Sequence, residues 1–150
     1  MFRNLSPVTK NLLLINIICF LADMVFSRYG VNLSHILGLH YVTASEFGFW
    51  QPITYMFMHA NFSHLFFNMF AVLMFAPAIE DRWGSRRFLI YYLVTGIGAG
   101  IIQEIVWALQ LQPVLNSVDP LMAAQLDNRV VTIGASGAVF GILLAFGWLF

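Results

Sequence analysis

The sequence contains few charged residues. Asp, Glu, Lys and Arg make up 9% of the 150 residues, whereas soluble domains usually carry about 25%. Hydrophobic residues reach 60%, and the mean hydropathy is +0.80. A single soluble domain of this length could not bury so much apolar surface. We therefore predict that the chain lies in a lipid bilayer, where lipid acts as its solvent.

The sequence also has a single cysteine and no net charge, which bear on disulfides and on nucleic-acid binding. Cys19 is the only cysteine, so no internal disulfide can form and the redox compartment cannot be inferred. Seven basic residues balance seven acidic ones, so no basic field indicates a nucleic-acid partner. The His, Cys and carboxylate spacings typical of metal sites are missing, and we predict no metal and no cofactor.

Four apolar segments remain, and they predict an all-α membrane protein, a polytopic bundle of transmembrane helices. Each approaches the roughly 20 residues that a helix needs to cross a bilayer. The first could be mistaken for a signal peptide, but no small-residue cleavage site follows it, so we interpret it as an uncleaved helix. The segments cover approximately residues 11–27, 62–80, 88–111 and 135–150.

The second segment belongs to an uncharged stretch, residues 47–79, that is too long for one helix. Asn61 is a strong N-cap candidate and predicts that the helix begins there. The preceding part should be a loop at the membrane interface, where Trp50 and Tyr55 would be typical.

Loop charges predict the orientation. Arg82, Arg86 and Arg87 lie between the second and third segments, and Arg3 and Lys10 precede or begin the first. The positive-inside rule places these in the cytoplasm, together with the N-terminus.

The loops on the other side are expected to be extracytoplasmic, and Pro and Asn in residues 112–129 predict that the second of them is irregular. In the third segment, Gly96, Gly98 and Gly100 favour close helix packing. Glu104 should face protein or water, and a structural role is more plausible for it than a catalytic one.

Two polar clusters stand out against ordinary membrane packing. His64 and Asn68 are four residues apart and share one helix face, with His59 just before them. Ser136 lies among small residues at the start of the fourth segment. The predicted topology places both clusters in the outer leaflet. Taken separately, such a serine is usually a packing residue and such histidines can be satisfied core residues.

The order and spacing of these residues resemble the rhomboid family of intramembrane serine proteases. The similarity extends from about Trp50 to the end of the chain. It rests on one set of elements: His59 through His64 to Asn68, Glu80 to Gly84, and Gly134-Ala135-Ser136-Gly137.

The resemblance implies a role for each residue. Ser136 would be the nucleophile, and His64 and Asn68 would donate hydrogen bonds to the oxyanion. His59, Gly134 and Phe140 would line the active-site cavity. Glu80 and Arg82 would hold the second and third helices together at the cytoplasmic end.

The chain departs from the family in three ways. A serine needs a base, which in rhomboids is a histidine on a later helix, but His35, His40, His59 and His64 all precede Ser136. Family members often have Tyr at position 140, and some have Arg at position 51, where this chain has Phe and Gln. Rhomboids have at least six helices, so we predict that residues 1–150 form a rhomboid-type domain truncated within its fourth helix.

We therefore predict an intramembrane serine endopeptidase of the cell membrane that cleaves transmembrane proteins with a Ser-His dyad. Because the dyad histidine is absent, the 150-residue chain should be inactive on its own. The main alternative is an inactive rhomboid-like protein that binds membrane clients. An unrelated structural segment or transporter is a further one, and it would tolerate alanine at Ser136 and Asn68.

Overall fold

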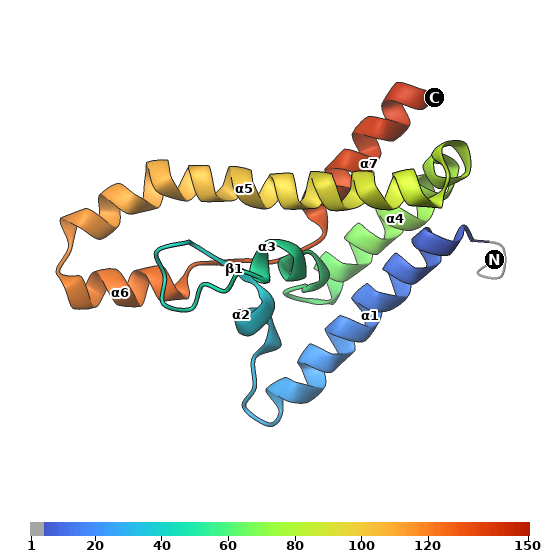
Figure 1. The fold of residues 1–150 in the computed structure, drawn as a ribbon. Coiled ribbons are helices and arrows are strands. Elements are labelled where there is room, and N and C mark those ends of the chain that lie inside the picture. Colours follow the sequence, from blue (N-terminus) through green and yellow to red (C-terminus); the bar gives the residue numbers. More distant parts are fainter. Residues whose placement is uncertain (1–4) are drawn as a thin grey trace.

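The computed structural model describes residues 5–150, so Arg3, used above to predict orientation, lies outside the described residues. Seven α-helices make up most of this part of the chain (Figure 1). The elements in order are α1 (Pro7–Ser27), α2 (Leu33–Leu37), β1 (Leu39–His40), α3 (Gln51–Thr54), the 3-10 helix η2 (Tyr55–Phe57), α4 (Phe62–Trp83), α5 (Ser85–Ser117), α6 (Pro120–Arg129), β2 (Val131–Thr132) and α7 (Ser136–Leu149).

Three helices are long and apolar enough to cross a membrane: α1, α4 and α5. The fourth predicted segment forms α7, a shorter apolar helix of 14 residues. Asn61 caps α4 as predicted, because its side chain accepts the backbone N–H of His64 at 2.8 Å. The chain is therefore an all-α membrane protein, and α7 packs against both α4 and α5.

Glu80, near the end of α4, caps the start of α1. Its carboxylate accepts the backbone N–H groups of Val8 and Thr9 at 2.9 and 2.8 Å, and the Thr9 hydroxyl at 2.8 Å. The Ser85 hydroxyl, at the start of α5, donates to it at 2.6 Å. The predicted role of Glu80 thus extends to a third helix, since it also satisfies N–H groups that α1 leaves unpaired. Arg82 is exposed and takes no part in this junction.

Small residues of α7, rather than the predicted glycines of α5, bring these two helices together. A Cβ at Gly141 would meet Thr95 at 2.7 Å, and one at Gly137 would collide with Ala99. Gly98, by contrast, has no heavy atom within 4 Å of the position of a Cβ. Gly96 and Gly100 lie close to Met56 and Tyr55, so two of the three predicted glycines allow close packing, though against η2 rather than α7.

The prediction of an irregular loop over residues 112–129 is wrong. Helix α5 continues through Pro113 to Ser117, and α6 occupies Pro120–Arg129 and returns along α5 (Figure 1). Asp119 starts α6 by accepting the N–H groups of Leu121 and Met122, both at 3.1 Å. An Asp N-cap followed by Pro at the first helical position is a helix-start signal, which outweighed the loop signal.

The segment between α1 and α4 is a folded structure on the far side from the Glu80 junction (Figure 1). Gln51 is buried, accepts the N–H of His40 at 3.1 Å and donates to the carbonyls of Ile36 and Glu46. Glu104 also has a partner here, the backbone N–H of Val42 at 3.1 Å. Glu104 thus faces protein, and its structural role stays a prediction.

Tyr55 is buried inside the protein, whereas an interface residue was predicted. It is 3% exposed, and its hydroxyl donates to the carbonyl of Gly96 on α5 at 2.5 Å. Gly96 and Gly100 leave room on α5 for this ring. The hydrogen bond satisfies the Tyr55 hydroxyl, which would otherwise be buried without a partner. Trp50 is exposed, and its place at the membrane interface stays a prediction.

Candidate active site

The segment before Ser136 is held in place at β2 and at Gly134. The short strand β2 pairs antiparallel with β1, and the N–H of Gly134 then donates to the Tyr55 carbonyl at 2.9 Å. Gly134 has φ +127°, a conformation that favours glycine. The turn places Ser136 at the first position of α7, and the residue is exposed.

Gly134 lies so close to His64 that no larger residue would fit beside the imidazole ring. A Cβ at this position would lie 2.7 Å from both Cε1 and Nε2 of the His64 ring, and 3.8 Å from Ser136 Oγ. The imidazole edge and the serine hydroxyl therefore both lie close to Gly134. The sequence-predicted trio of His64, Gly134 and Ser136 is brought together from two elements that are 70 residues apart.

His64 presents Nε2 toward this point because its other nitrogen is engaged. The backbone N–H of Ala60 donates to Nδ1 over 3.4 Å. A neutral ring that accepts at Nδ1 carries its proton on Nε2. The ring edge beside Gly134 and Ser136 is thus a hydrogen-bond donor rather than a base.

Asn68 lies one turn further along α4, on the same face as His64. It is 7% exposed, and its Nδ2 has no hydrogen-bond partner within residues 5–150. Leaving a buried amide N–H unpaired typically costs 1–3 kcal/mol of stability. A donor kept at that cost is an indication of function.

The start of α7 supplies further donors. No side chain caps this helix, and Ala135 at the N-cap position is fully buried. The first N–H groups of a helix have no partners inside it, and the helix dipole favours negative charge there. An oxyanion beside Ser136 would meet these N–H groups as well as the side chains from α4.

His59 lies behind His64. The two rings meet edge to face, with their centroids 5.0 Å apart. His59 is 2% exposed, and neither ring nitrogen has a partner among the described residues. Burial lowers the pKa of His59 to about 4, and repulsion from a protonated His64 adds to the shift. His59 is therefore neutral at pH 7.

The remaining predicted residues and histidines are placed apart from this group. Phe140 is 71% exposed on α7, one turn after Ser136, so its role in the cavity stays a prediction. His40 and His35 hydrogen-bond backbone carbonyls, of His35 at 2.8 Å and of Asn128 at 3.4 Å respectively. In the described part of the chain, no three His, Cys, Asp or Glu side chains gather as metal ligands.

Sequence reasoning missed two residues that position the site. Tyr55 holds Gly134 through its carbonyl and α5 through its hydroxyl, but a tyrosine before a predicted helix gave no such signal. Ala60 fixes the His64 ring through its backbone N–H, which no residue type could reveal.

Comparisons with known proteins identify the family of this chain. The family model described as Rhomboid domain matches residues 46–150, and the chain belongs to the rhomboid family. It is 31% identical over 143 residues to Rhomboid protease AarA of Providencia stuartii, covering 92% of this chain and 49% of that protein.

Two further relatives show the range of the family. Putative rhomboid protease YdcA of Bacillus subtilis is 37% identical over 93 residues, 62% of this chain and 37% of that protein. Rhomboid-like protein 11, chloroplastic, of Arabidopsis thaliana is 30% identical over 132 residues, 87% of this chain and 38% of that protein. The chain thus spans between about a third and a half of the length of these relatives.

Proposed function

We propose that the protein is an intramembrane serine endopeptidase in which Ser136 is the nucleophile. The observation that carries the proposal is the position of Gly134, where a Cβ would lie 2.7 Å from the His64 ring and 3.8 Å from Ser136 Oγ. Membership of a family that includes named proteases supports the same reaction class.

The reaction would proceed through an acyl-enzyme. Ser136 Oγ attacks the carbonyl carbon of a peptide bond, and its proton passes through the base to the leaving amine. Water then hydrolyses the ester and returns the proton to Ser136. His64 Nε2–H, Asn68 Nδ2–H and the N–H groups at the start of α7 would stabilise the oxyanion. Removing one such donor typically costs 10²–10³ in rate.

The base would be a histidine outside residues 1–150, paired with Ser136 as a dyad. His64 is a poor candidate because its Nδ1 accepts the Ala60 N–H and its Nε2 is the donor. The 150-residue chain is accordingly expected to be inactive by itself. Detectable cleavage of a membrane substrate by the purified 150-residue chain would contradict the dyad.

Substrates are proposed to be transmembrane proteins, cleaved near or within their membrane segments. We propose a cell-membrane location with the N-terminus in the cytoplasm and the active site toward the extracytoplasmic side. The basic residues Arg82, Arg86 and Arg87 at the α4–α5 turn support this orientation. Ser136 begins α7 at the opposite end of the bundle from that turn (Figure 1).

The test is covalent labelling of the full-length protein, including any residues encoded after Phe150, with a fluorophosphonate probe. We expect labelling of the wild type and cleavage of a single-pass membrane reporter, and loss of both in Ser136→Ala. Ser63→Ala, at an exposed serine of α4, is the matched control and should retain both. Equal labelling of Ser136→Ala and wild type would refute the proposed nucleophile.

A second candidate is an inactive client-binding protein, and one observation favours it: one relative is named a rhomboid-like protein rather than a protease. Sequencing the gene past the Phe150 codon separates the two. A later hydrophobic segment with a histidine supports the protease. A stop codon directly after Phe150, with no probe labelling, supports the client-binding protein.

A further inference from the structure

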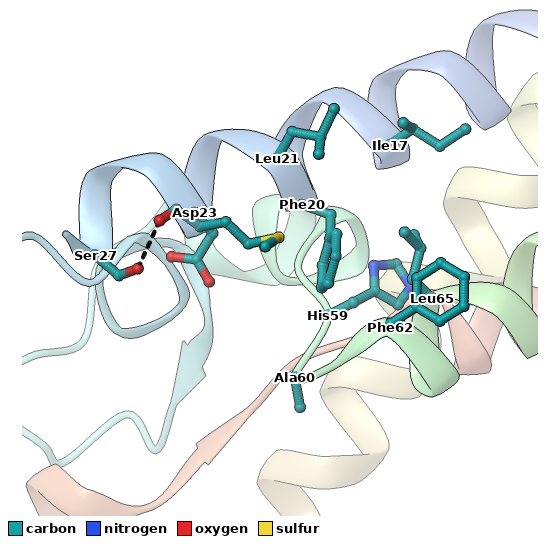
Figure 2. A pocket seen from close by; sticks show the side chains of 10 residues that line it. Ile17, Phe20, Leu21, Asp23, Ser27, His59, Ala60, Phe62 and Leu65 are labelled. Carbon is teal, nitrogen blue, oxygen red and sulfur yellow. Dashed lines mark hydrogen bonds between the residues drawn. The ribbon is translucent and has the colours of Figure 1, made fainter.

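A cavity of about 690 Å³ lies between α1 and the start of α4, and its wall is mostly apolar (Figure 2). Ligand sites commonly have volumes of 300–1,000 Å³. Its polar side chains are Asp23 and Ser27 from α1 and His59 from the loop before α4. Ser136 is not part of its lining. The cavity therefore meets the candidate active site at His59 but does not include Ser136.

The cavity continues along the two helices into a second hollow of about 230 Å³. Ile17, Phe62 and Leu65 line both. The second hollow has only apolar side chains in its wall, with Leu13 and Leu73 at its far end. Together the two form one groove, hereafter the α1–α4 groove, that is polar at one end and apolar along the rest.

His59 is the unsatisfied group of this groove. The residue is 2% exposed, and both ring nitrogens lack a partner among residues 5–150. Figure 2 shows the ring between Phe20 of α1 and Leu65 of α4. A neutral imidazole offers one donor and one acceptor. A buried polar side chain of this kind calls for a partner that can both accept and donate.

We propose that the α1–α4 groove binds a single-chain amphiphile with an uncharged, hydroxyl-bearing head, of the monoacylglycerol class. The head lies against His59, and the acyl chain follows the apolar part between α1 and α4.

The lining selects this chemistry. No Lys or Arg lines either hollow, so a carboxylate or phosphate would have no counter-charge there, and Asp23 would repel it. The Asp23 carboxylate already accepts the N–H and hydroxyl of Ser34 at 3.2 and 2.7 Å. The two hydroxyls of a monoacylglycerol head offer one donor and one acceptor for the two nitrogens of His59 without displacing these bonds.

The groove opens on helix faces that a bilayer would surround with acyl chains. Both walls of the groove are helices long and apolar enough to span the membrane. Ile17, Leu21 and Phe66 in those walls are exposed, and such surface is stable only against apolar groups. An acyl chain meets this need, and its hydroxyl head would meet the need of His59.

The experiment uses the full-length protein in lipid nanodiscs with a diazirine-bearing monoacylglycerol as the probe. After irradiation, labelled residues are located by mass spectrometry. We expect label concentrated on the groove walls of α1 and α4, displaced by excess monoolein and not by excess oleate. His59→Phe removes both nitrogens and should lower groove labelling about fivefold, the effect of losing roughly one hydrogen bond.

Ile17→Trp tests the groove by filling it without touching His59. It should abolish groove labelling, whereas Ile102→Trp, at an exposed site on α5, should leave it unchanged. Label spread evenly over α1, α4 and α5 would mean ordinary bilayer contact and would overturn the proposal. So would equal displacement by oleate, or an unlabelled groove that a transmembrane substrate peptide crosslinks instead. None of these outcomes depends on Ser136, so failure here leaves the proposed protease function standing.

Discussion

The two ends of α4 are treated in opposite ways. At its C-terminal end, Glu80 accepts four hydrogen bonds from α1 and α5. At its N-terminal end, Asn68 Nδ2 and both nitrogens of His59 are buried without a partner in the described chain. The first arrangement is typical of a structural junction. The second is typical of a functional site, whose polar groups are paired only when a ligand or a transition state is bound. The same helix thus connects a fully hydrogen-bonded end to an end with unpaired buried polar groups.

The largest effect should come from Gly134→Ala in the full-length protein. The added Cβ would meet the His64 ring at 2.7 Å, and the alanine backbone would have to adopt φ +127°. We expect protease activity to fall about 10³-fold or more, because both the donor and the serine move. Fluorophosphonate labelling rates measure this. Ala135→Gly, which adds no atom beside His64, is the control, and retained activity in Gly134→Ala would contradict the geometry.

Asn68→Ala should reduce activity by about 10²–10³ with little loss of stability. The amide nitrogen has no partner to lose, so thermal unfolding in detergent should change by less than the activity does. Asn16→Ala is a useful contrast, because its buried side chain donates to the Leu12 carbonyl at 2.8 Å. It should lower stability and spare activity. The reverse pattern would show that Asn68 is only a packing residue.

At the opposite end, Glu80→Gln should destabilise the protein by about 3 kcal/mol without a specific effect on chemistry. The amide keeps the shape of Glu80 but has one acceptor oxygen fewer and leaves N–H groups of α1 unpaired. Asp81→Asn provides the control, since Asp81 is exposed and accepts a single hydrogen bond, from Ser6. Equal stability of both variants, measured by denaturant titration in detergent, would exclude the junction role.

The smallest effect concerns pH. The pKa of His59 is about 4 in the folded protein and about 6.5 when unfolded. The unfolded state binds the extra proton first, so stability should fall as pH drops below about 6.5 and level off below about 4. Between pH 7 and 5 the loss should reach about 2 kcal/mol at most. His59→Gln should flatten this slope in thermal unfolding, and an unchanged slope would assign it to other groups.

The helices of the bundle and the local residues of the site could be predicted from the sequence because their signals are local. Apolar length indicated α1, α4 and α5, and Asn61 marked the start of α4. The spacing of His64 and Asn68 placed both on one face. Local signals also misled at residues 112–129, where Pro113 suggested a break, but packing carries α5 past it.

Long-range partners were beyond the sequence. Nothing near Glu80 indicates that it caps a helix beginning 73 residues earlier. Nor does any pattern show that Tyr55 holds Gly134 beside His64, since that contact exists only after η2, β2 and α5 are assembled. Roles came from family resemblance, whereas the free Nε2 edge of His64 came from the three-dimensional arrangement.

Helix α5 has a further consequence through its length. Its 33 residues extend for about 50 Å at 1.5 Å per residue, against about 30 Å of hydrocarbon. To fit inside, the helix would have to tilt far beyond the roughly 20° that is usual. We therefore expect its last turns, with α6 folded back on them, to project out of the hydrocarbon core. A cysteine placed at exposed Ser117 would report, through an impermeant thiol reagent, on which side of the membrane this projection lies.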